Sequence, residues 1–117
     1  MSLELLVAVG LLGGAGAVAR FVLDDAVSSR LNGDFPSGTL AVNLSGSLLL
    51  GVLAGAGLDR EADQLLAVGL LGSYTTFSTW MLESHRLGED GRLLLAAANL
   101  AGSLVLGVLA VWAGRAL

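Results

Sequence analysis

Charged residues fall in clusters along the chain, and long apolar stretches separate the clusters. The uncharged stretches run over residues 5–19, 38–58, 64–82 and 93–114. A helix needs roughly 20 residues to cross a hydrocarbon core about 30 Å thick. Three stretches have that length, and the first reaches it if its helix continues past Arg20 to about Leu23. The pattern therefore predicts four membrane-spanning helices, at about residues 3–23, 38–58, 64–83 and 92–115.

The segments that link these predicted helices are short and polar. Residues 24–37 contain the only proline, residues 59–63 read DREAD, and residues 83–92 read ESHRLGEDGR. No link is long enough to fold by itself outside the membrane. The first 19 residues lack the basic start of a signal peptide, since their only charge is Glu4. We therefore expect a single all-α, four-helix membrane domain over residues 1–117, multi-pass in the cell membrane.

Composition supports lipid as the solvent and excludes several classes of function. Of 117 residues, 55% are hydrophobic and 14% charged, which leaves too few charges to cover a small soluble domain. The net charge is −4 and lysine is absent, so no basic stripe could bind nucleic acid. There is no cysteine, and the one histidine, His85, lies among charged residues in a predicted link. We find no catalytic grouping and expect no enzymatic activity.

The arginines give only a weak indication of orientation. Four spans place the N-terminus, residues 59–63 and the C-terminus on one side, which carries Arg60 and Arg115. The other side carries Arg30, Arg86 and Arg92, with Arg20 near it. The positive-inside rule works by such counts. This difference leaves open both a single orientation and insertion in two orientations.

The middle of the third predicted span is unusually polar. Residues 69–80, GLLGSYTTFSTW, contain two glycines and five serine or threonine side chains. Those hydroxyls can bond back to the preceding turn of an intact helix. The alternative, which we favour, is a helix broken near its middle, whose freed carbonyls can bind a cation and whose amides attract an anion.

Other polar residues lie within or beside the spans. Asn43 needs a partner in the membrane, either to hold helices together or to face a polar path. Asn99 and Ser103 stand four residues apart on one helical face and raise the same two alternatives. Arg20 and Glu83 fall on one side, where they can pair, or Arg20 can attract anions to a pore mouth. The simpler explanation is that these charged side chains extend along the helix to the membrane surface, that is, they snorkel. The many glycines within the spans predict close helix packing.

Three segments resemble the signatures of the CrcB/Fluc family of fluoride channels. They are residues 13–21 (GGAGAVARF), 38–43 (GTLAVN) and 72–79 (GSYTTFST). The resemblance extends to the length of the chain, the four spans and the order of the motifs. It implies an antiparallel, dual-topology dimer that contains two pores and passively exports fluoride from the cytoplasm to reduce its toxicity. It also implies a structural sodium ion at the dimer centre, held by backbone carbonyls of Gly72 and Thr75.

The resemblance also implies which residues line the fluoride pathway. Asn43 matches the family's pore asparagine, and Phe77 matches the first phenylalanine of its TTFSTF motif. Ser103 matches a polar position of the fourth helix, and Arg20 and Glu83 fall on charged positions. The expected pathway residues are Asn43, Phe77, Trp80, Thr76, Ser103 and Arg20.

The chain departs from the family motif at Trp80, which replaces the second phenylalanine. Tryptophan keeps an aromatic edge and adds an N–H donor, but it is bulkier. Some organisms carry paired family genes whose products form a heterodimer, so the partner is either an identical chain or a paralogue.

Two other functions remain as alternatives. A small multidrug transporter is also a four-helix, dual-topology dimer, but it needs a carboxylate within a span, typically the first. Here the first span has only Glu4, at its edge. A non-conducting membrane scaffold would explain the glycines but not Asn43 or the hydroxyl-rich third span.

Overall fold

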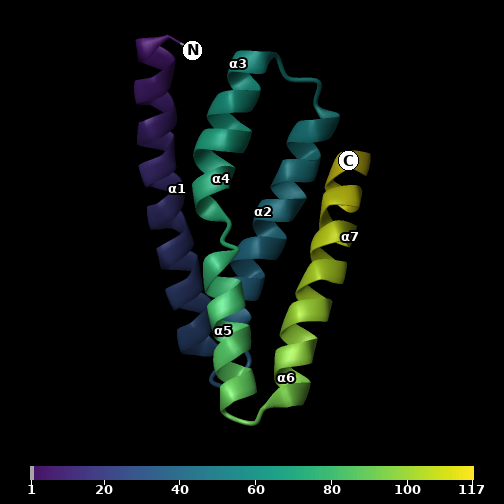
Figure 1. The fold of residues 1–117 in the computed structure, drawn as a ribbon. Helices are drawn as coiled ribbons and strands as arrows, with labels where there is room; N and C mark the ends of the chain where they lie inside the picture. Colours follow the sequence, from purple (N-terminus) through teal and green to yellow (C-terminus); the bar gives the residue numbers. More distant parts are fainter. Residues whose placement is uncertain (1) are drawn as a thin grey trace.

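Four long helical spans run alternately up and down the bundle in the computed structural model, which describes residues 2–117 (Figure 1). All four are long and apolar enough to cross a membrane, and no strand occurs in these residues. The N-terminus, the start of the third span and the C-terminus lie toward one end of the bundle. The bundle is 49 Å long, enough for a bilayer core and its interfaces. The prediction of an all-helical, four-span membrane protein is confirmed.

The first span is a single helix, α1 (Leu3–Arg30), which is longer than predicted. Ser2 caps its start, since its hydroxyl accepts a hydrogen bond from the N–H of Leu5. Near the far end Ser28 donates to a carboxylate oxygen of Asp24, one turn earlier. Arg30 in the last turn interacts favourably with the helix dipole. Arg20 therefore lies inside the helix rather than near its end.

The second span, α2 (Ser37–Gly55), ends three residues before the predicted boundary. Gly57 has a φ of 68°, a conformation that glycine adopts readily and that turns the chain toward the third span. The link between α1 and α2 is short, because α1 includes residues 24–30, which the sequence pattern had assigned to the link.

The third span is broken. It consists of α3 (Arg60–Asp63), a π-helical segment η1 (Gln64–Leu71), α4 (Gly72–Tyr74) and, after a gap, α5 (Ser78–Glu89). Thr75 is extended, with φ −80° and ψ 158°. The predicted break near the middle of this span is confirmed, and it falls at residues 75–77.

Both ends of the third span are helical where the sequence suggested links. Asp59 caps α3 by accepting from the N–H of Ala62 at 2.8 Å. At the other end α5 continues because Ser84 and Leu87 are buried. His85 therefore lies on a helix, where it is exposed and pairs with Glu89.

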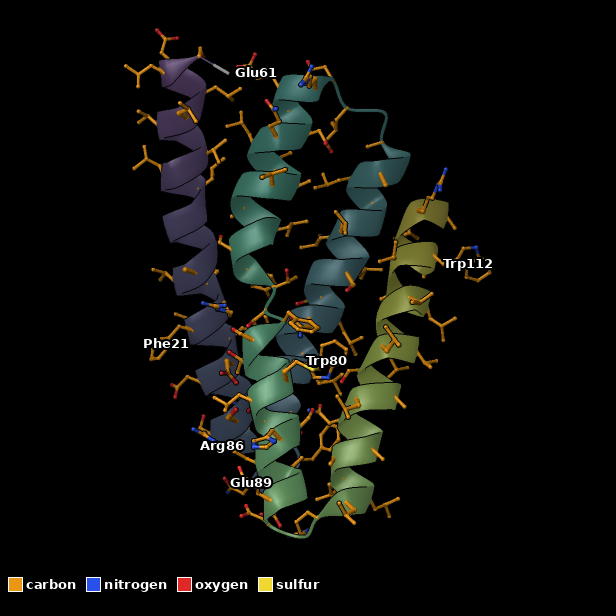
Figure 2. All side chains as sticks on the ribbon, in the orientation of Figure 1. Phe21, Glu61, Trp80, Arg86, Glu89 and Trp112 are labelled. Atoms are coloured by element: carbon orange, nitrogen blue, oxygen red, sulfur yellow. The ribbon has the colours of Figure 1, made fainter. Side chains whose placement is uncertain are left out.

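The fourth span combines α6 (Leu93–Ala97), a second π-helical segment η2 (Ala98–Gly102) and α7 (Ser103–Ala116). It packs closely along α2. A Cβ on Gly114 would collide with the main-chain oxygen of Leu48, and one on Gly51 with that of Val111. These contacts confirm the predicted close packing at glycines. Large apolar side chains such as those of Phe21 and Trp112 point outward, as expected for a surface in lipid (Figure 2).

Candidate functional site

The side chain of Asn43 bonds to the main chain at the break in the third span. Its Nδ2 donates to the carbonyl oxygen of Thr76, and its Oδ1 accepts from the N–H of Thr76, both at 2.9 Å. One amide side chain thus satisfies a backbone donor and a backbone acceptor that the break removes from the helical ladder. This is the bundle-holding contact that the sequence left open for Asn43, and it places the residue directly at the break.

Hydroxyl groups stabilise both sides of the break. Thr76 Oγ1 caps α5 by accepting from the N–H of Thr79 at 3.2 Å. On the other side Ser73 and Thr75 donate to carbonyls of the preceding turn, at 3.0 Å from Leu70 O and Leu71 O respectively. The hydroxyls therefore bond back to the helix, and the helix is also broken.

Several carbonyls at the end of α4 have lost their helical donors. Within residues 2–117, no backbone N–H bonds to the carbonyls of residues 72–75, because the N–H of Thr76 bonds to Asn43 and the next residues begin a new helix. Carbonyls at a helix C-terminus carry partial negative charge. Gly72 and Thr75, the predicted sodium-binding residues, belong to this set, so the oxygens present fit a small cation.

An open groove of about 400 Å³ lies against the break and is bounded by α2, the third span and α7. Most of its wall is apolar, formed by leucine and valine side chains. Most of the predicted functional residues line it: Asn43, Gly72, Thr75, Thr76, Phe77, Trp80 and Ser103. Residues from three separate spans thus meet at one place.

Two aromatic rings stand together in this groove. The centroids of Phe77 and Trp80 are 5.7 Å apart and their planes are at 87°, an edge-to-face arrangement. Phe77 is 70% exposed in the single chain. Trp80 lies between α5 and the fourth span (Figure 2). Its indole N–H donates to the carbonyl of Asn99 at 2.8 Å.

Arg20 does not line the groove. It lies beside a smaller cavity of about 150 Å³, together with Thr39, Thr79 and Thr76. Thr76 lines both spaces and so stands between Arg20 and the groove. Among the described residues Arg20 and Glu83 form no ion pair; instead Glu83 accepts a hydrogen bond of 2.5 Å from Thr39.

Sequence reasoning missed Thr39, Thr79 and Ser84 as parts of the site. Each is a hydroxyl residue in or beside an apolar span, which was the only available signal. Thr39 bonds to Glu83, 44 positions away, and Ser84 bonds to Asn99, 15 positions away. Thr79 bonds to Thr76, three positions away, at the break. Only the folded bundle shows these pairings.

Comparison with known proteins identifies relatives over nearly the whole chain. Residues 7–115 match the family described as CrcB-like protein, Camphor Resistance (CrcB). A protein of Mycolicibacterium paratuberculosis named fluoride-specific ion channel FluC 2 is 54% identical over 111 residues, which cover 95% of this chain and 91% of that protein. FluC 2 of Mycobacterium bovis is 48% identical, with 98% and 91% covered. FluC 1 of Symbiobacterium thermophilum is 45% identical, with 95% and 94% covered.

Proposed function

The chain belongs to the CrcB-like family, and from this membership we propose that it is a fluoride-selective channel that exports fluoride passively from the cytoplasm. Its relatives at about 50% identity are named fluoride-specific ion channels. The observation that carries the proposal is the pair of hydrogen bonds between Asn43 and Thr76. They hold the broken part of the third span against α2, at the point where residues from three spans converge on one groove.

Fluoride is small and strongly hydrated, so a pathway must replace its water with close hydrogen-bond donors. Asn43 has a second N–H besides the one donated to Thr76. Ser103 contributes a hydroxyl, and the ring edges of Phe77 and Trp80 carry partial positive charge. In a groove with mostly apolar walls, such donors act strongly because water does not screen them. A narrow path of this kind favours fluoride over larger halides.

In this proposal Arg20 attracts an anion toward the path, and the carboxylate of Asp24, which lines the same cavity, opposes that attraction. Arg20 stands beside the cavity that Thr76 separates from the groove. A fixed charge in a low-dielectric setting raises the local concentration of counter-ions. In the proposed pathway, fluoride gathers near Arg20 and then passes Thr76 to reach Phe77 and Trp80.

We propose that the working channel is an antiparallel, dual-topology dimer of identical chains with two pores. The groove is open along one side, and Phe77 is largely exposed within it, so a single chain leaves one wall missing. A second copy would cover this face and complete the path. The near balance of arginines on the two sides is compatible with insertion both ways. A paralogue as partner is the alternative assembly.

A structural sodium ion at the dimer centre completes the proposal. The carbonyls of Gly72 and Thr75 would hold it, since they lack backbone donors and lie at the negative end of a helix. A cation there would neutralise the facing carbonyls of two copies and fix the breaks together.

Growth of a fluoride-sensitive bacterial strain that expresses the chain tests this function. A fluoride channel restores growth in fluoride without altering resistance to cationic drugs. A multidrug transporter would give the reverse result, and a scaffold would change neither. The multidrug-transporter alternative needs a carboxylate within the first span. The helix α1 does contain Asp24 and Asp25, but both lie near its C-terminal end, where Asp24 accepts a hydrogen bond from Ser28.

A further inference from the structure

Trp80 is bound to the fourth span by a closed cycle of hydrogen bonds. Its indole N–H donates to the main-chain carbonyl of Asn99 at 2.8 Å. The side-chain amide of Asn99 donates to Ser84 Oγ at 2.8 Å, and Ser84 Oγ donates to the main-chain carbonyl of Trp80, also at 2.8 Å. Three bonds thus join three residues into a ring between α5 and η2.

Two of the three side chains in this cycle are buried, and each polar side-chain atom of the cycle has a hydrogen-bond partner. Asn99 is 1% exposed and Ser84 is 5% exposed. The remaining oxygen of the Asn99 side chain accepts from the hydroxyl of Ser103, at the longer distance of 3.3 Å. Satisfied polar networks in a low-dielectric interior hold one geometry, because opening them leaves groups without partners.

We propose that Trp80 and Asn99 act as a strut that fixes the width of the groove, and that the indole N–H of Trp80 is not a ligand of the permeating anion. This inference rests on the proposed fluoride-channel function. The indole nitrogen has a single hydrogen, and the Asn99 carbonyl occupies it. Trp80 therefore presents only its ring to fluoride, in edge-to-face contact with Phe77.

The same network assigns the donor on this wall to Ser103. Its bond to Asn99 is the longest of the four and therefore the weakest. The hydroxyl can turn from Asn99 to an anion in the groove while the cycle around Trp80 stays closed. Asn99 is thus a positioning residue for both Trp80 and Ser103.

Nuclear magnetic resonance of the indole N–H groups tests the strut directly. The chain, labelled with 15N-tryptophan in lipid nanodiscs, gives one signal each for Trp80 and Trp112, and a Trp112→Phe variant assigns them. We expect the Trp80 signal to stay in place when fluoride replaces chloride. A fluoride-dependent displacement of that signal overturns the inference.

Two variants separate a positioning role from a general loss of structure. Asn99→Leu should displace the Trp80 indole signal and lower fluoride efflux by more than about tenfold, while Asn32→Leu, in the exposed link before α2, changes neither. Trp80→Phe removes the N–H but keeps a ring and restores the phenylalanine of the family motif, so fluoride efflux should fall by less than about tenfold and chloride should stay excluded. Fluoride efflux abolished in Trp80→Phe, with the dimer intact, contradicts the inference.

The proposed channel function and the proposed strut can be contradicted separately. If the parent chain transports no fluoride in vesicles, the proposed function is wrong. The strut is then still judged by the response of the Trp80 signal to Asn99→Leu, which needs no transport. If fluoride passes but the Trp80 signal follows fluoride, only the strut is wrong.

Discussion

The side-chain amide of Asn43 pairs with the main chain of Thr76 through two hydrogen bonds of 2.9 Å, one in each direction. This pairing substitutes for the helical hydrogen bonds that the third span gives up at its break. It also joins the second span to the break, so that the groove has walls from both. A break at this depth is tolerated because a protein side chain satisfies the exposed backbone groups.

Asn43→Asp should strongly reduce fluoride efflux. A carboxylate still accepts from the N–H of Thr76, but its second oxygen faces the Thr76 carbonyl in place of a donor. Leaving that acceptor unpaired costs about 1–3 kcal/mol, and the added negative charge repels the anion. Efflux from vesicles should fall by at least tenfold, roughly the effect of 1.4 kcal/mol. Asn32→Asp, the same change in the exposed link, is the control, and equal efflux in the two variants would contradict the role of Asn43.

Phe77→Ile should also reduce fluoride efflux strongly while the chain still folds. Isoleucine keeps the apolar volume but lacks the electropositive ring edge offered to the anion. Because Phe77 is 70% exposed in the single chain, its replacement leaves little cavity. Trp112→Ile is the control, since Trp112 is 72% exposed and lines neither the groove nor the cavity beside Arg20. Efflux measured alongside circular dichroism separates transport from folding; unchanged efflux in Phe77→Ile would count against the pathway.

Gly114→Ala should destabilise the bundle. The new Cβ would collide with the main-chain oxygen of Leu48 on α2, and a backbone atom cannot rotate away. Overpacking of this kind costs about 1–3 kcal/mol. Gly88→Ala is the control, because nothing lies within 4 Å of a Cβ there. Unfolding followed by circular dichroism in detergent should show a lower midpoint for Gly114→Ala alone.

Removal of sodium should weaken the dimer if the carbonyls of Gly72 and Thr75 hold the ion. A ligand that binds only the assembled state stabilises it by mass action, by about 2.7 kcal/mol at a hundredfold excess over its dissociation constant. Purified protein should remain dimeric in sodium chloride and dissociate on dilution in choline chloride at equal ionic strength. A dimer equally stable in both salts would exclude the sodium site.

The sequence predicted the number of helices and the existence of the break well, because both depend on local composition. Apolar runs between charged clusters locate the spans, and hydroxyls with glycines mark the middle of the third. Helix ends were less predictable. Residues 24–30 and 84–89 are polar enough to resemble links, yet both are helical: Ser28 bonds to Asp24 within α1, and Leu87 is buried in α5.

The partners within the site could not be predicted from the sequence. Asn43 and Thr76 are 33 positions apart, and Trp80 and Asn99 are 19 apart, so only the packing of the spans pairs them. Trp80 is an example of a residue whose bonding partner only the structure reveals. From the sequence alone its indole N–H is an added hydrogen-bond donor, whereas in the structure that N–H is bonded to the Asn99 carbonyl.

Fluoride efflux from liposomes that contain only this purified chain shows whether the chain by itself forms a passive, fluoride-selective channel. The vesicles are loaded with potassium fluoride, and valinomycin carries potassium so that only passive anion flow limits release. We expect rapid fluoride release, with chloride retained in parallel vesicles. No fluoride release from well-folded protein, or chloride release at a similar rate, would contradict the proposed function.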